Sequence, residues 1–226
     1  TNLNPVVISS YGNGNATIDA GNYYGIFVYN TAGIKVSRLN IWGSGGVSNN
    51  DNGIFFYLDL PSNSMLYYVN IDSVNIYGFG KAGVSIGAWP TDSSRSGFND
   101  IYITNSDVHD NLDAGISIWG YWNPLDSAYS HKNIYIAHCN VYNNIGISGV
   151  NRHSGNGIVI GNSKIALIEY CEVFNNGQNN DYSFGGPVGI WAWDSDQIII
   201  QYNESHHNKT STLDGGGFDL DGGVSN

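Results

Sequence analysis

The sequence predicts an all-β solenoid of about seven stacked coils, and three observations support this. Gly accounts for 30 of the 226 residues and Tyr for 16, while most residues that favour helices are scarce, so a helical bundle is excluded. A short motif, Gly followed by apolar-x-apolar, occurs seven times at intervals of 28 to 42 residues. Between these motifs, single apolar positions recur every 32 to 35 residues. One such unit cannot bury its apolar face alone, whereas stacked units share a continuous core.

Each unit contains two or three short strands. The seven glycine motifs occupy residues 25–28, 53–56, 83–86, 115–118, 157–160, 189–192 and 217–220. A second column comprises Val36, Ile71, Ile103, Ile136, Ile168 and Ile200, and a third, five residues further on, comprises Ile41, Ile76, Val108, Val141, Val173 and Ser205. Around these positions apolar and polar residues alternate with a period of two, which is typical of strands.

A column of asparagines lies eight residues beyond the second column. Its members are Asn111, Asn144, Asn176 and Asn208. Asn tolerates the left-handed backbone conformation, and amides stacked at one turn can bond to one another along the stack. Coils of roughly 32 residues with short strands and an internal Asn ladder resemble the right-handed parallel β-helix of the pectin-lyase-like family, with its PbH1 repeats.

The resemblance covers essentially all seven coils. It implies that residues 1–226 form one domain, a single-stranded right-handed parallel β-helix of the carbohydrate-active type. The chain opens near Pro5 and stops at Asn226 without polar caps, and open solenoid ends expose strand edges. We therefore expect an open-ended portion or a fragment of a longer solenoid, with additional coils or end-to-end self-association at its ends.

Two further columns carry side chains of one kind. Cys139 and Cys171 share an inward column, which favours a ladder of free thiols in the core, with a disulfide between coils as the alternative. An outward column predicts a stripe of stacked rings. Its members are Trp42, Tyr77, His109, Tyr142, Phe174 and His206.

Charge and composition exclude several partners. The net charge is −11 with only eight Lys and Arg, and phosphate neutralisation needs basic clusters, so no nucleic acid is expected. No stretch approaches the roughly 18–20 apolar residues of a membrane span, so no membrane insertion is expected. Few charges among many Asn, Ser, Thr, Gly and Tyr are typical of a secreted or cell-surface protein, which we expect to be bacterial.

The outward positions of the glycine motifs predict a ligand groove. The residues two and four places after each glycine point outward and include Trp119, Trp191 and Trp193. Tryptophan rings stack on the C–H faces of sugars, so these three residues are candidates for substrate binding. Asp113, in a segment before one motif, is a fourth candidate. The alternative is that loops cover this row and the aromatic side chains pack against them.

Asp219 and Asp221 form the candidate carboxylate pair. They alternate with apolar residues in the last motif, so both should point outward, about 6.5–7 Å apart. Glycoside hydrolysis uses two carboxyl groups roughly 5–9.5 Å apart. One of them must stay protonated, which burial beside Trp191 or Trp193 would achieve. Solvated surface carboxylates are one alternative, and a Ca²⁺ site completed by Asp214 is another.

Arg152, His153 and Asp214 complete the catalytic candidates. They lie in segments of variable length that precede the motifs at one edge of the repeat. Variable loops on a rigid scaffold usually carry function, which favours these residues. A simply solvated loop histidine is the alternative for His153. Apart from the possible Ca²⁺, no metal or cofactor is expected.

These features favour an extracellular enzyme that acts on a polysaccharide or other glycan. Hydrolysis is favoured over β-elimination, because few Lys or Arg could serve as the base and an acidic protein repels a polyuronate. The alternatives are a non-catalytic, adhesive glycan-binding protein and a structural solenoid that stacks or polymerises.

Overall fold

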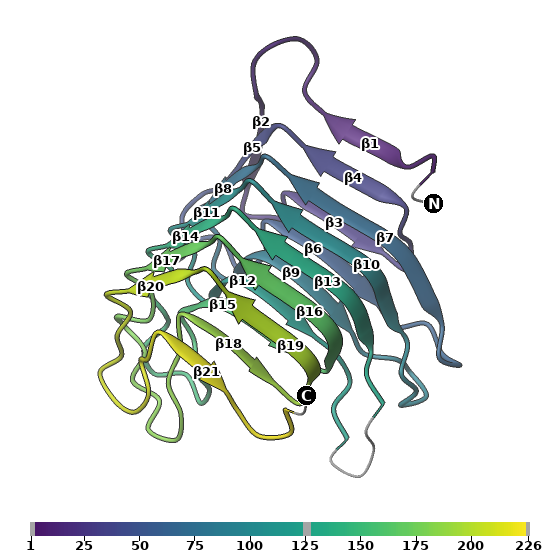
Figure 1. Ribbon diagram of the computed structural model, residues 1–226. Helices are drawn as coiled ribbons and strands as arrows, with labels where there is room; N and C mark the ends of the chain where they lie inside the picture. Colours follow the sequence, from purple (N-terminus) through teal and green to yellow (C-terminus); the bar gives the residue numbers. More distant parts are fainter. Residues whose placement is uncertain (1–2, 124–127, 225–226) are drawn as a thin grey trace.

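The computed structural model describes residues 3–123 and 128–224 as a parallel β-solenoid of about seven turns, with the two ends of the chain at opposite ends of the stack (Figure 1). Within these residues the strands form three parallel sheets of seven strands each, named A, B and C here, and no helix occurs. No helix in this part of the chain could therefore cross a membrane. The all-β solenoid of about seven coils predicted from the repeat is confirmed.

Each coil contributes one strand to each sheet, in the order A, B, C. Sheet A contains β1 (Val6–Ser9), β4 (Ile34–Ser37), β7 (Met65–Asp72), β10 (Gly97–Thr104), β13 (His131–Ala137), β16 (Ser163–Glu169) and β19 (Asp196–Gln201). Sheet B contains β2 (Ala16–Gly21), β5 (Leu39–Gly43), β8 (Asn75–Tyr77), β11 (Asp107–His109), β14 (Asn140–Tyr142), β17 (Glu172–Phe174) and β20 (Glu204–His206). Sheet C contains β3 (Ile26–Tyr29), β6 (Ile54–Leu58), β9 (Ala82–Ala88), β12 (Ala114–Trp119), β15 (Asn156–Gly161), β18 (Ile190–Trp193) and β21 (Phe218–Leu220).

Equivalent residues of successive coils pair in register. In sheet A, Ile71 pairs with Val36 of the preceding coil and with Ile103 of the following one. All three side chains are fully buried, as are Val108 and Val141 in the equivalent column of sheet B. The apolar columns of the sequence are therefore the walls of one continuous core.

The glycine of the repeated motif lies where sheets B and C approach each other closely. A Cβ atom at Gly115 would stand 2.2 Å from Cγ1 of Val141 and 2.9 Å from Nδ2 of Asn144. The same contact recurs one coil later, where a Cβ atom at Gly157 would stand 2.3 Å from Cγ1 of Val173. Real Cβ atoms do not approach other atoms so closely, so lack of space selects glycine at this corner.

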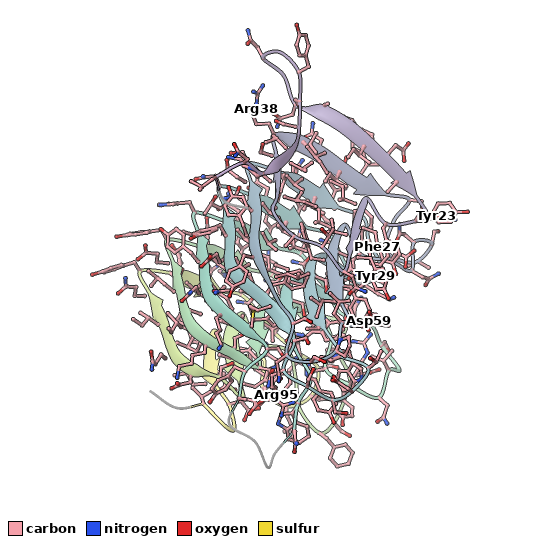
Figure 2. All side chains as sticks on the ribbon, turned by 90° about the vertical axis from the view of Figure 1, so that its right-hand side faces the viewer. Tyr23, Phe27, Tyr29, Arg38, Asp59 and Arg95 are labelled. Carbon is pink, nitrogen blue, oxygen red and sulfur yellow. The ribbon has the colours of Figure 1, made fainter. Side chains whose placement is uncertain are left out.

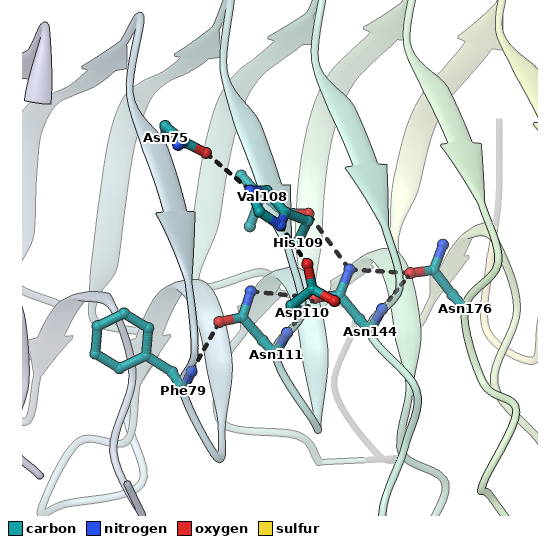
Figure 3. Close-up of polar contacts among 8 residues, drawn as sticks. All are labelled: Asn75, Phe79, Val108, His109, Asp110, Asn111, Asn144 and Asn176. Carbon is teal, nitrogen blue, oxygen red and sulfur yellow. Dashed lines mark hydrogen bonds and ion pairs between the residues drawn. The ribbon is translucent and has the colours of Figure 1, made fainter. Parts of the chain in front are cut away.

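The asparagine column forms a continuous hydrogen-bonded ladder in the interior (Figure 3). Nδ2 of Asn111 donates to Oδ1 of Asn144 at 3.1 Å, and the bonds from Asn144 to Asn176 and from Asn176 to Asn208 are both 2.9 Å. The Oδ1 atoms of Asn144, Asn176 and Asn208 each also accept the backbone N–H of the preceding ladder asparagine, at 3.0 to 3.2 Å. The predicted stacking at one turn is confirmed.

The left-handed conformation expected of these asparagines falls one residue earlier. Asp110, Asn143, Asn175 and His207, which each precede a ladder member, have φ values of 51 to 56°. A second set of left-handed residues makes the short turn from sheet A to sheet B. Its members are Arg38, Ser73, Asn105, His138, Tyr170 and Tyr202. The ladder asparagines thus stabilise the turn through their side chains, while their neighbours bend the backbone.

The two cysteines are free and buried in the interior. The thiol of Cys139 lies 3.3 Å from the carbonyl oxygen of Ala137, and that of Cys171 lies 3.4 Å from the carbonyl oxygen of Glu169. The equivalent position one coil earlier is Ser106, whose hydroxyl donates to the carbonyl oxygen of Thr104 at 2.7 Å. The column therefore holds small side chains that bond to the backbone, and the thiol ladder is confirmed.

The outer face of sheet B carries a stack of six rings. Its members are Trp42, Tyr77, His109, Tyr142, Phe174 and His206. Consecutive ring centroids are 4.6 to 5.9 Å apart, and the rings from Tyr77 to His206 lie within 15° of parallel. Each inner ring is therefore covered on both faces by its neighbours. The predicted aromatic stripe is confirmed, and we name it the sheet B stack.

Candidate functional site

A cleft on the outer face of sheet C, at the coils nearest the C-terminus, contains most of the predicted site residues. It encloses about 420 Å³ and is lined by Trp122, His153, Tyr182, Phe184, Gly185, Gly186, Val188, Trp191, Trp193, Asp214, Asp219, Asp221 and Gly222. The strands β18 and β21 form its floor. Its flanks come from the loops between sheets B and C and from the segments that follow sheet C. We name it the acidic cleft, because three carboxylates and no lysine or arginine line it.

A second, smaller cleft adjoins the first. It encloses about 160 Å³ and is lined by Asp113, Ala114, Ser117, Ile118, Trp119, Arg152, His153, Asn156, Val159 and Trp193. Trp193 and His153 belong to both clefts, so the two form one depression that runs along the solenoid axis. All nine site residues predicted from the sequence line one cleft or the other. The loop positions that share one edge of the repeat are therefore brought together.

Trp119 and Trp193 occupy space that glycines leave open. A Cβ atom at Gly87 would stand 2.3 Å from Cζ2 of Trp119, and one at Gly161 would stand 2.2 Å from Cε2 of Trp193. Each indole therefore lies over the glycine of the preceding coil. The indole N–H of Trp119 donates to the Ser85 hydroxyl at 3.1 Å, which holds the ring in place.

Trp191 also points out from the sheet, but it is buried. Only 6 % of it is exposed, and it packs with Val159, Val188 and Trp193 in a small cluster on the outer face of sheet C. The expectation that its ring is exposed to stack on a sugar is therefore wrong. Val188, from the loop before β18, and the ring of His153, from the loop before β15, pack on it, which is the covered packing that the sequence left open. Trp193 and Trp119, which are half-buried, remain the rings that reach the clefts.

The two carboxylates of the predicted pair differ from expectation in burial and in position. Asp219 lies on β21 beside Trp191, whereas Asp221 lies just beyond the strand end and accepts the backbone N–H of Gly222 at 2.6 Å. Both residues are exposed. The burial that was expected for one carboxyl group of the pair is therefore absent.

Asp214 holds two loops together. Its Oδ2 atom accepts the backbone N–H of Gly186 at 2.8 Å, and Gly215 beside it donates to the carbonyl oxygen of Pro187 at 3.0 Å. The hydroxyl of Thr212 donates to the carbonyl oxygen of Tyr182 at 2.6 Å. Asp214 therefore positions the wall of the acidic cleft, besides lining it.

Arg152 and Asp113 pair with each other. The guanidinium Nη1 atom donates to Oδ1 of Asp113, so the ion pair joins the loops of two successive coils. Both side chains are partly exposed, and such pairs contribute little to stability. The pair instead forms one wall of the smaller cleft and supplies hydrogen-bonding groups there.

His153 lies where the two clefts meet. Its ring meets that of Trp191 edge to face, with the centroids 5.1 Å apart, and its Nδ1 atom lies 3.1 Å from Nδ2 of Asn156. Burial lowers the pKa of the imidazole below its ordinary value, and the nearby Arg152 guanidinium acts in the same direction. The carboxylates of Asp113, Asp221 and Asp214 oppose this shift in the pKa.

The acidic residues of the cleft do not gather into a metal site. Within residues 3–123 and 128–224 no three His, Cys, Asp or Glu side chains converge closely enough to hold a metal ion. The Ca²⁺ site considered for Asp214, Asp219 and Asp221 therefore gains no support from their arrangement.

Three aromatic residues that line the acidic cleft were not among the site residues predicted from the sequence. Trp122 follows β12, and Tyr182 and Phe184 lie in the segment 177–189. Phe184 is 84 % exposed, and its ring is tilted by 56° against that of Tyr182, with the centroids 5.8 Å apart. The sequence offered one signal for these residues, which is that they are aromatic residues within polar loops. A surface loop has no core in which such side chains could be buried.

No family model matches this chain, and no curated protein matches it.

Proposed function

We propose that the protein binds a polysaccharide chain along the outer face of sheet C, in the depression formed by the two clefts. The lining of this depression supports the proposal most. It combines the rings of Trp119, Trp193 and Trp122 with carboxylates, an imidazole and amides. Sugar rings present both apolar C–H faces and hydroxyl groups, so they need this mixture.

The charge of the site favours a neutral or weakly charged glycan. Asp214, Asp219 and Asp221 line the acidic cleft, and the whole chain carries a net charge of −11. A polyuronate or a sulfated chain would be repelled at long range. Carboxylates, in contrast, are strong acceptors for the hydroxyl groups of a neutral sugar.

The resemblance to right-handed β-helices of the pectin-lyase-like family agrees with this proposal, as does a polar composition typical of secreted proteins. A fold by itself does not specify a function, so the argument depends on the site.

A glycan array followed by isothermal titration calorimetry tests the proposal. We expect binding to at least one neutral glycan and a weaker response to polyuronates. Lack of binding to every neutral glycan, by protein whose circular dichroism shows folded β structure, would contradict the proposal.

Glycoside hydrolysis is the second candidate function, because three carboxylates line one cleft beside tryptophan. It requires that bound sugar bury Asp219 or Asp221 and so keep it protonated. Reducing ends measured on the bound glycans would then increase without ultraviolet absorbance, whereas a lyase would produce new reducing ends together with the ultraviolet absorbance of an unsaturated product. Asp219→Asn and Asp221→Asn should each lower turnover on the order of 10²- to 10⁴-fold. Binding without either signal would leave the protein a non-catalytic binder.

A further inference from the structure

A chain of three hydrogen-bonding side chains fixes the ring of His153. The indole N–H of Trp191 donates to Oδ1 of Asn156 at 2.9 Å, and the Asn156 amide nitrogen lies 3.1 Å from Nδ1 of His153. An indole N–H can only donate, so the oxygen of the Asn156 amide must face it. The NH₂ group therefore faces His153, where Nδ1 must accept. In the neutral ring the proton then resides on Nε2.

We propose that His153 is a specificity-determining residue whose fixed Nε2–H group donates a hydrogen bond to an oxygen of the bound glycan, where the two clefts meet. The identity of the ligand rests on the function proposed above. Among the residues that the structure describes, no acceptor bonds to Nε2, although the side chain is only partly exposed. A hydroxyl, ring or glycosidic oxygen of a sugar is an acceptor of the required kind.

The surroundings of His153 keep it neutral. Burial and the guanidinium of Arg152 lower its pKa, against the opposing effect of three carboxylates. These carboxylates belong to Asp113, which precedes β12, and to Asp214 and Asp221, which flank β21, so they come from two coils. Trp191 and Asn156, from β18 and β15, bring no charge. A proton on Nδ1 would also set two donors, that N–H and the Asn156 NH₂, against each other.

The fixed tautomer changes the role expected of His153. A ring that carries its proton on Nε2 and accepts through Nδ1 has no free lone pair to act as a base on a bound sugar. His153 was a catalytic candidate on the sequence. The hydrogen-bond chain favours recognition of an acceptor oxygen in place of proton abstraction.

The tautomer can be measured without any ligand. Long-range ¹H–¹⁵N spectra of ¹⁵N-histidine-labelled protein distinguish the two ring nitrogens, and we expect a neutral Nε2–H signature for His153 at neutral pH. His131 is the internal control. Its Nδ1 accepts the backbone N–H of Phe98 at 3.2 Å and its Nε2 donates to the carbonyl oxygen of Trp119 at 2.8 Å, so it must show the same tautomer. An Nδ1–H or averaged signature for His153 alone would overturn the inference.

Two variants test whether the hydrogen bonds of Asn156 and Trp191 fix the tautomer of His153. Asn156→Asp replaces the NH₂ donor with an acceptor, so the proton should move to Nδ1 and the pKa of His153 should rise. Trp191→Phe removes the donor that orients the amide, so the two tautomers should become mixed. His131 should keep its signature in both variants. An unchanged His153 signature in Asn156→Asp would show that Asn156 does not set the tautomer, and the inference would fail.

Recognition is tested with cellohexaose, xylohexaose and mannohexaose. His153→Gln retains an N–H donor, whereas His153→Leu has none. We expect the Leu variant to bind the best of these ligands about three- to tenfold more weakly than wild type, with the Gln variant between them. Equal affinity of the Leu variant would overturn the recognition role. A wild type that binds no glycan would overturn the proposed function and this role together, while the tautomer measurement would still stand.

Discussion

The sheet B stack and the tryptophan row of sheet C are both outward aromatic columns on one scaffold, yet their rings are used differently. In the sheet B stack every coil after the first contributes a ring, and neighbouring rings cover each other's faces. In sheet C, Gly87 and Gly161 interrupt the column, and Trp119 and Trp193 lie over these glycines. Their indoles line open clefts as a result. Glycines between rings thus distinguish a row that can meet a ligand from one that stabilises the coil stack.

The N-terminal part of sheet C provides a second comparison, in two neighbouring outward columns. Without an intervening glycine, Tyr29 stacks on Tyr57 with ring centroids 6.1 Å apart, and Phe27 stacks on Phe55 at 5.5 Å. The hydroxyl of Tyr29 donates to Asp59 at 2.6 Å, on the side of the molecule that also carries Phe27 (Figure 2). Across Gly87 the indole of Trp119 still contacts Tyr57, with the ring centroids 6.0 Å apart and the planes tilted by 34°, and from Trp119 onward the rings of this column line the clefts.

The largest effect that we expect concerns His131, which supports the tryptophan row through its bond to the carbonyl oxygen of Trp119. Burial lowers its pKa to about 4, below the ordinary value of 6.5. The unfolded chain therefore takes up a proton before the folded one, so stability is full above about pH 6.5 and falls as the pH decreases. Urea unfolding at pH 4 should show that the free energy of unfolding is lower by about 3 kcal/mol because of this residue.

The carboxylates also titrate in this range, so the comparison is with His131→Gln, in which this part of the pH dependence should be absent. An identical pH dependence in both proteins would contradict the assignment.

Trp193→Ala should weaken glycan binding by about 2 kcal/mol, roughly thirtyfold in Kd, because it removes the ring shared by both clefts. Calorimetric titration with the best ligand measures this. Tyr142→Ala, in the middle of the sheet B stack, is the control and should bind as wild type does. If both variants lose affinity equally, the distinction between the two columns fails.

Phe174→Ala, in the sheet B stack, should lower the stability of the fold and leave the glycan affinity unchanged. Its ring stacks on Tyr142 at 4.9 Å and on His206 at 5.1 Å, so its removal should lower the free energy of unfolding by about 1–2 kcal/mol and leave Kd unchanged. Urea denaturation and titration calorimetry together check this. A change in Kd without a change in stability would show that the stack itself binds ligand.

The smallest and most specific change is Gly161→Ala. The added methyl group would meet the indole of Trp193 at 2.2 Å, so the ring must move, and we expect about tenfold weaker binding. Gly14→Ala is the matched control, since a Cβ atom there meets nothing within 4 Å and its φ is not positive. Full affinity in Gly161→Ala would mean that the position of Trp193 over this glycine does not matter for the ligand.

The sequence by itself determined the solenoid. Repeating columns such as Val36, Ile71 and Ile103, and the Asn111–Asn144–Asn176 series, predicted the coil length, the inward faces and the ladder. These predictions held because pairing in a parallel solenoid is local, so a residue meets its counterpart one repeat away. The same argument predicted the sheet B stack, in which each ring packs on the next.

Only the tertiary structure decided which outward residues remain open to solvent. Trp191 and Trp193 stand two residues apart, and the sequence treated them alike, but Val159, Val188 and the ring of His153 pack on Trp191, which is buried, while Trp193 lines both clefts. Asp219 and Asp221 proved exposed, and the bonds of Trp191 and Asn156 set the tautomer of His153. The conformation of a loop depends on the loops of neighbouring coils, as the bond from Gly186 to Asp214 shows, and no repeat in the sequence encodes such contacts.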